Sequence, residues 1–150
     1  MDVLRRNTDY ALLAMVHLAA HWKQGPASVR KLASQENISY PLVRKLMQKL
    51  CNCGLVESSM GSKGGFSLSR QPSEINLLEI IETIQGPLRL NRCVLGIDIC
   101  PRQKAYPVSR KLAKLQKNMT RELHGITLDD LLQGRNPARK RNPSRLIGTK

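Results

Sequence analysis

The stretch Ser39-Tyr-Pro-Leu-Val-Arg-Lys-Leu-Met-Gln-Lys-Leu50 decides the fold that we predict for this chain. On a helix of 3.6 residues per turn, its apolar residues share one arc of about 140°, formed by Leu42, Val43, Leu46, Met47 and Leu50. The opposite face is polar and basic, with Pro41, Arg44, Lys45 and Gln48. Ser39 suits an N-cap and Pro41 suits the first helical turn. We therefore predict a short amphipathic helix with a basic outer face.

A second short helix is predicted just before it, over residues 29–36. Ser28 can cap this helix, and Leu32 and Ala33 supply its buried side. Asn37 can adopt the left-handed conformation that ends a helix. Two short helices joined by a tight polar turn, the second one basic outside, are typical of a helix-turn-helix.

A glycine-rich hairpin is predicted directly after this pair. Residues 55–59 can form one strand and residues 66–69 a returning strand, and Met60-Gly-Ser-Lys-Gly-Gly65 joins them as a flexible turn. A hairpin of this length favours glycine in any case. Its place after a basic helix favours a wing whose tip, at Ser62, Lys63 and Gly64, approaches a phosphate backbone.

Longer helices are predicted on either side of this unit. An apolar stripe of helical period runs from Leu4 to Trp22, and its histidines, His17 and His21, are expected at the surface or rim rather than as ligands. Asn76 can cap a strongly apolar helix over residues 77–85, which Gly86 and Pro87 close. Thr127 can cap a short final helix over residues 126–132.

The segment after Pro107 carries apolar residues close to heptad spacing, at Val108, Leu112, Leu115, Met119 and Leu123. The rest of this segment is rich in Lys and Arg. A narrow apolar seam on a long basic helix favours a partner helix, so we predict a dimerisation helix. Packing of the seam against the chain's own domain is the alternative.

These elements predict a mainly α fold with a small β-hairpin wing, that is, a winged helix-turn-helix plus a long dimerisation helix. We divide the chain into a DNA-binding domain (1–86), a cysteine-containing sensor loop (87–106), a dimerisation helix with a terminal helix (107–133) and a basic disordered tail (134–150). The tail has six positive and no negative charges.

The formal net charge of +14 favours a polyanionic partner, with nucleic acid first and an anionic membrane surface second. The sequence shows neither a signal segment nor a long apolar run, so we expect a cytoplasmic protein without a membrane partner. Its histidines are scattered, and no Ser/His/Asp, Cys/His or phosphate-loop arrangement is present, so we expect no enzyme. A nucleic-acid-binding protein without sequence specificity is an alternative to a regulator.

Five segments in this order resemble one protein family. They are Thr8-Asp-Tyr-Ala-Leu-Leu-Ala-Met-Val-His-Leu-Ala19, Ile38-Ser-Tyr-Pro-Leu-Val-Arg-Lys-Leu46, Gly54-Leu-Val56, Gly61-Ser-Lys-Gly-Gly-Phe66 and Ile126-Thr-Leu-Asp-Asp-Leu131. Together they resemble the bacterial winged-helix regulators of the Rrf-two type, which include IscR, NsrR and CymR. The resemblance implies a homodimeric transcription regulator, expected to be a repressor, on a pseudo-palindromic double-stranded DNA operator.

The resemblance also implies which residues read DNA. The base-reading positions of the family fall on Pro41, Arg44 and Lys45, and Arg or Lys suits guanine edges. Lys45 can equally contact a phosphate. The usual wing arginine of the family falls on Met60, and Lys63 is its candidate substitute. The DNA-binding set that we predict is Ser39, Tyr40, Pro41, Arg44, Lys45, Gln48, Ser62, Lys63 and Gly64.

Cys93 and Cys100 fall where sensor members of the family hold an iron–sulfur cluster, of the 2Fe-2S or 4Fe-4S type. The third cysteine, expected near Tyr106, is absent, and Asp9 matches an aspartate ligand of the nitric-oxide-sensing branch. Such clusters normally have four protein ligands, and here only Cys93, Cys100 and Asp9 can be named. A reversible thiol or disulfide switch, and a regulator that answers to a protein partner instead, remain open.

Cys51 and Cys53 lie at the end of the basic helix. Small apolar fillers are the favoured interpretation, with Cys51 expected to be the more exposed of the two. A metal-chelating or oxidation-sensitive pair is the alternative.

Overall fold

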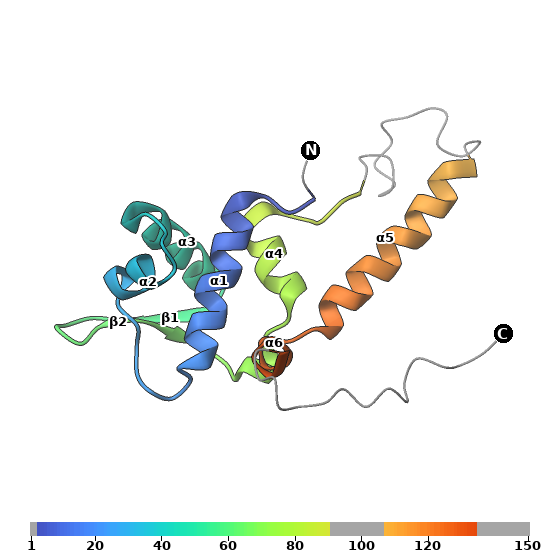
Figure 1. The fold of residues 1–150 in the computed structure, drawn as a ribbon. Coiled ribbons are helices and arrows are strands. Elements are labelled where there is room, and N and C mark those ends of the chain that lie inside the picture. The colour runs from blue at the N-terminus through green and yellow to red at the C-terminus, as the bar shows by residue number, and fades with distance from the viewer. Residues whose placement is uncertain (1–2, 91–106, 135–150) are drawn as a thin grey trace.

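A computed structural model of the chain describes residues 3–90 and 107–134. Its elements are α1 (Arg6–Ala20), α2 (Val29–Gln35), α3 (Tyr40–Asn52), β1 (Val56–Ser59), β2 (Gly65–Leu68), the 3-10 turn η1 (Pro72–Glu74), α4 (Leu77–Gln85), α5 (Pro107–Gly125) and α6 (Leu128–Gly134). Helices α2 and α3 and the hairpin lie on one side of α1, and α5 lies on the other side (Figure 1). The predicted class, a mainly helical winged helix with one antiparallel hairpin, is confirmed.

Local sequence signals shape the helix-turn-helix. The Ser28 hydroxyl accepts a hydrogen bond of 3.1 Å from the Lys31 N–H and so caps α2. Asn37 has φ 54°, the left-handed conformation expected of it. Ser39 occupies the N-cap of α3, but its side chain makes no capping bond within the described part of the chain. The first turn of α3 thus keeps N–H groups that its N-cap side chain does not satisfy.

One hydrophobic core unites these elements. The apolar arc of α3 is buried as predicted, except that Leu42 is only half-buried. Leu128 of α6 is fully buried in the same core, and backbone bonds join Leu77 N to Ile126 O and Leu128 N to Ile75 O. The final helix therefore packs with residues of the region 1–86. The boundaries that we drew between parts of the chain stay a prediction.

The wing is an antiparallel pair in which Val56 lies opposite Leu68 and Ser59 lies opposite Gly65. The Ala27 N–H donates to Phe66 O at 2.8 Å, and the Phe66 N–H donates to Ala27 O at 2.9 Å. These two bonds tie β2 to the segment that leads into α2. The hairpin is consequently fixed relative to the helix-turn-helix.

The apolar seam of α5 is divided between two environments. Met119 and Leu123 pack against a second cluster formed by Leu78, Ile81 and Leu88. Val108 and Leu115 keep 46% and 55% of their surface exposed. Packing against the chain's own domain, the alternative to a partner-facing seam, therefore holds for the C-terminal half of α5.

His17 is buried, which contradicts its expected place at the surface or rim. It keeps only 7% of its surface exposed, and its Nδ1 lies 3.1 Å from Glu36 Oε1. Burial lowers the pKa of His17 below its ordinary value, although the hydrogen bond with Glu36 opposes the shift. His21 is half-buried, and its ring stacks on that of His17 with 4.5 Å between centroids.

Candidate nucleic-acid interface

The outer face of α3 is a continuous exposed polar surface. Packing of the apolar arc into the core turns the opposite arc outward. The predicted residues on this arc are all exposed in the structure: Tyr40, Pro41, Arg44, Lys45 and Gln48. Gln48 Nε2 donates to Asn52 Oδ1 at 3.1 Å, one turn further along the helix. A helix that shows such a face fits the major groove of DNA.

The charged side chains of α2 and α3 are all positive. Neither α2 nor α3 contains an acidic residue. Apart from Lys49, whose ammonium group is bonded to Ile84 O, the exposed cations of the two helices are Arg30, Lys31, Arg44 and Lys45. Without acids on these helices to offset them, these side chains create a positive potential suited to a phosphate backbone.

The beginning of α3 adds backbone donors to this surface. The Ser39 side chain makes no capping bond in the described residues, so it leaves the N–H groups of Tyr40 and Leu42 in the first turn uncapped; Pro41 has no N–H. The positive end of the helix dipole lies at the same place. Phosphate oxygens are favoured ligands of such a helix start.

The wing tip exposes Ser62 and Lys63, and Gly64 is half-buried beside them. The Gly64 N–H donates to Gly61 O at 3.0 Å and closes the turn. A Cβ built on Gly64 would collide with the carbonyl oxygen of Ser59, so this tight turn needs glycine. Met60 is fully exposed and carries no charge, which leaves Lys63 as the cation of the tip.

Of the three predicted cluster ligands, the structure describes Asp9. Asp9 is exposed in the first turn of α1, where an acid also suits the helix dipole. Cys93 and Cys100 lie outside the described residues. Within residues 3–90 and 107–134, no group of three or more His, Cys, Asp and Glu side chains is placed to hold a metal ion.

Cys51 and Cys53 differ from their expected exposure. Cys53, the C-cap of α3, is the exposed one, and Cys51 is half-buried against the main core. The prediction that Cys51 is the more exposed is therefore wrong. The reason is that Cys51 follows Leu50 at the edge of the buried arc, whereas the chain has left the helix at Cys53.

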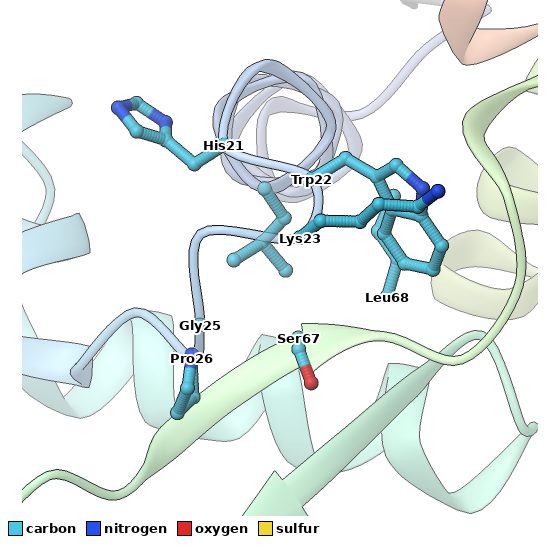
Figure 2. Close-up of a pocket in the computed structure, with 8 residues that line it drawn as sticks. His21, Trp22, Lys23, Gly25, Pro26, Ser67 and Leu68 are labelled. Carbon is cyan, nitrogen blue, oxygen red and sulfur yellow. The ribbon is translucent and has the colours of Figure 1, made fainter.

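A pocket of about 320 Å³ lies where the end of α1 meets β2 (Figure 2). Trp22, Pro26 and Leu68 give it apolar walls, and His21 and Lys23 are its titratable residues. Figure 2 shows the His21 ring pointing away from the side chains of Trp22 and Lys23. Small-molecule sites need polar groups that converge on the ligand, so we assign no ligand to this pocket.

Three polar side chains that the sequence did not mark out link the helices. Lys49 Nζ donates to Ile84 O at 2.8 Å, Gln85 bonds the start of α1, and Gln116 bonds the segment after α4. Gln116 is buried although it lies on a helix otherwise covered with cations. The sequence offered one signal for this role, namely that Gln116 stands next to Leu115 of the apolar seam.

A model of one protein family, described as "Rrf2: Iron-dependent Transcriptional regulator", matches residues 4–134. The chain belongs to the Rrf2 family. This match confirms the resemblance to the Rrf-two type regulators that the sequence motifs indicated. As a member of this family, the protein is a DNA-binding transcriptional regulator and not an enzyme.

Named relatives of this Rrf2 chain are regulators too. It is 32% identical over 136 residues to the HTH-type transcriptional regulator NsrR of Halalkalibacterium halodurans, covering 83% of this chain and 86% of that protein. It is 29% identical over 123 residues to the HTH-type transcriptional regulator CymR of Bacillus subtilis, covering 81% and 83%.

Solved structures show the same fold. The structure of CymR, the global cysteine regulator of B. subtilis, matches with a TM-score of 0.75 at 27% identity, over 89% of this chain and 98% of CymR. T. potens IscR matches with a TM-score of 0.71 at 28% identity, over 92% and 91%. None of the helices described for this Rrf2 chain is long and apolar enough to cross a membrane.

Proposed function

We propose that this Rrf2-family regulator is a homodimeric repressor that reads a pseudo-palindromic operator with α3 and the wing. The observation that carries the proposal is the exposed face of α3, where Arg44 and Lys45 stand on a helix without acids. Arg44 and Lys45 suit guanine edges in the major groove. Lys63 at the wing tip, together with Ser62 and Gly64, would contact the adjacent backbone. Ser39 and Tyr40 would flank the bases at the helix start.

The second subunit is proposed from the exposed half of α5. Val108 and Leu115 give this half of α5 an exposed apolar surface, and α5 lies on the opposite side of α1 from the hairpin (Figure 1). A twofold pair of such helices would cover both patches at once and leave both α3 helices free. Two recognition helices related by a twofold axis select an operator with the same symmetry.

The test of DNA reading compares two charge reversals on a mapped promoter fragment. Arg44→Glu with Lys45→Glu is expected to abolish preference for the operator, because each base contact is worth about 1–3 kcal/mol. Arg110→Glu with Lys114→Glu makes the same change in net charge on exposed positions of α5 away from Val108 and Leu115, and it is expected to keep that preference. If both variants keep the operator preference of the unaltered protein, α3 does not read bases.

We also propose that operator affinity is modulated through the segment that holds Cys93 and Cys100, by an iron–sulfur cluster with Asp9 as a further ligand. The exposed carboxylate of Asp9 is compatible with this role. A bound cluster would supply a group that responds to iron, oxygen or nitric oxide. A thiol or disulfide switch of the same two cysteines, or a protein partner, is the competing proposal.

These proposals are separated by anaerobic purification, followed by the visible spectrum and assays of iron and sulfide. A coloured protein that loses iron and sulfide when Cys93→Ala and Cys100→Ala are introduced supports the cluster, and Asp9→Ala is then the next variant. A colourless protein whose operator affinity changes with a thiol reductant supports the switch. A colourless protein without that response favours a protein partner.

A further inference from the structure

Side-chain hydrogen bonds connect the C-terminal end of α4 to three other helices. In the sequence this end is Ile84-Gln-Gly-Pro-Leu-Arg-Leu90. A lysine of α3 donates a hydrogen bond to it, and a glutamine of α4 forms hydrogen bonds with the start of α1. A glutamine of α5 forms hydrogen bonds with the segment after α4. Figure 1 shows the end of α4 beside the beginning of α1. We call residues 84–90 the α4 junction.

The contact with α3 is made by Lys49. Its Nζ lies 2.8 Å from Ile84 O, one of the last four carbonyls of α4, which have no partner inside a regular helix. A cation is favoured there because the helix end carries partial negative charge. At about 100° per residue, Lys49 lies about 140° around α3 from Arg44. Lys49 therefore flanks the DNA-reading face and points to α4.

The contact with α1 is made by Gln85. Its Oε1 accepts from Thr8 Oγ1 at 2.7 Å and from the Arg5 N–H at 3.0 Å, and its Nε2 donates to Val3 O at 2.9 Å. Thr8 is fully buried. A single amide thus satisfies three polar groups around the first turn of α1.

The contact with α5 is made by Gln116. Its Oε1 accepts from the Leu90 N–H at 2.8 Å, and its Nε2 donates to Leu88 O at 2.8 Å and contacts Thr120 Oγ1 at 3.1 Å. The amide is buried, so an unmatched polar atom there would cost more than one at the surface. The backbone at Leu88 and Leu90 is held to α5 at this point.

We propose that Lys49 is a positioning residue, which sets the recognition helix against the α4 junction, and that Gln85 and Gln116 join α1 and α5 to the same junction. A shift of α5 would then move Ile84 and tilt α3 through Lys49. The proposal rests on the proposed function, because it presupposes that α3 reads DNA. Lys49 itself contacts no base in this arrangement.

The first test replaces Lys49 with methionine and measures affinity for the operator and for a random duplex. Lys49→Met is expected to lower operator affinity about tenfold, the size of effect that coupling residues have, and to leave random-duplex affinity unchanged. The slope of affinity against salt should also stay the same. Lys49→Arg, which keeps a donor at Ile84 O, should restore most of the operator affinity. Lys114→Met, at an exposed position of α5 that lies about 100° or more around the helix from both Val108 and Leu115, is the matched control and should change neither affinity.

Other outcomes overturn the positioning role. An equal loss on both duplexes with a salt slope reduced by about one would make Lys49 a phosphate contact. No loss on either duplex would remove any role in binding. If the unaltered protein itself failed to prefer its operator, the proposed function would fail, which is distinct from a failure of Lys49 alone.

The second test is a double-mutant cycle of Lys49→Met and Gln116→Met, read as operator affinity. Substitutions without a shared network act additively. We expect the double variant to bind about threefold or more tighter than additivity predicts, because both changes release the same junction. Additive effects would overturn the link from α5. If thermal melting shows that Gln116→Met does not fold, Gln116→Glu, which keeps the acceptor for the Leu90 N–H, takes its place.

Discussion

Replacing Leu115 with glutamine should weaken the proposed dimer without weakening the fold of each subunit. Leu115 lies in the N-terminal half of α5 and keeps 55% of its surface exposed. Complete burial of a leucine is worth about 1.5–3 kcal/mol. About half of that, roughly 0.75–1.5 kcal/mol, is therefore still to be gained when a partner covers Leu115. Twofold symmetry doubles the effect to about 1.5–3 kcal/mol, or about 12–150-fold in the dimer dissociation constant.

Sedimentation equilibrium gives the dissociation constant, and urea unfolding under conditions that favour the monomer gives the stability of the subunit. Leu123→Ala is the contrasting variant, because Leu123 packs inside its own subunit against α4. It should cost about 2–4 kcal/mol of folding free energy. An unchanged dissociation constant for Leu115→Gln would refute a dimer built on this half of α5. A large loss of monomer stability would show that Leu115 packs within its own chain.

Three further changes test the stability of the fold. The folded-state pKa of His17 is lowered by burial, so the unfolded chain binds the proton more readily. Stability should fall as the pH drops through the ordinary histidine value of 6.5 and level off below the folded pKa; His17→Gln should flatten this part of the curve in thermal melts. Gly65→Ala should lower stability by about 1–3 kcal/mol, because its Cβ would collide with the Ala27 carbonyl oxygen. Gly125→Ala is its control in urea unfolding, since a Cβ there meets no atom within 4 Å among the residues described. If Gly65→Ala left the free energy of unfolding unchanged, the wing would not be anchored at this contact. Asn76→Ala removes a cap whose Oδ1 accepts from the Glu79 N–H at 3.0 Å, and should cost about 1 kcal/mol in the same assay; no loss would mean that the cap is dispensable.

Local signals carried most of the fold prediction. The caps at Ser28 and Asn76 and the left-handed Asn37 each depend on a few neighbouring residues, and each is found as predicted. The buried arc of α3 follows from periodicity, since a helix that buries one side must expose the other. The exposed arc with Arg44 and Lys45 could be predicted for the same reason, before any tertiary contact was known.

Contacts between distant segments explain what was missed. His17 was expected at the surface because its partner, Glu36, stands 19 residues away on the turn after α2. The seam of α5 was expected to face one partner, because spacing alone does not reveal that Leu78 and Ile81 cover Met119 and Leu123. Helical periodicity predicts that an apolar face will be covered and is silent about which surface covers it.

The sequence by itself determined the order of elements, the winged helix and the basic outer face of α3, because propensity, capping and period act over a few residues. Tertiary structure alone decided how the helices are joined. Gln85 meets Arg5 across 80 positions and Lys49 meets Ile84 across 35. A polar side chain acquires such a role only when folding brings an unmatched backbone group within hydrogen-bonding distance of it.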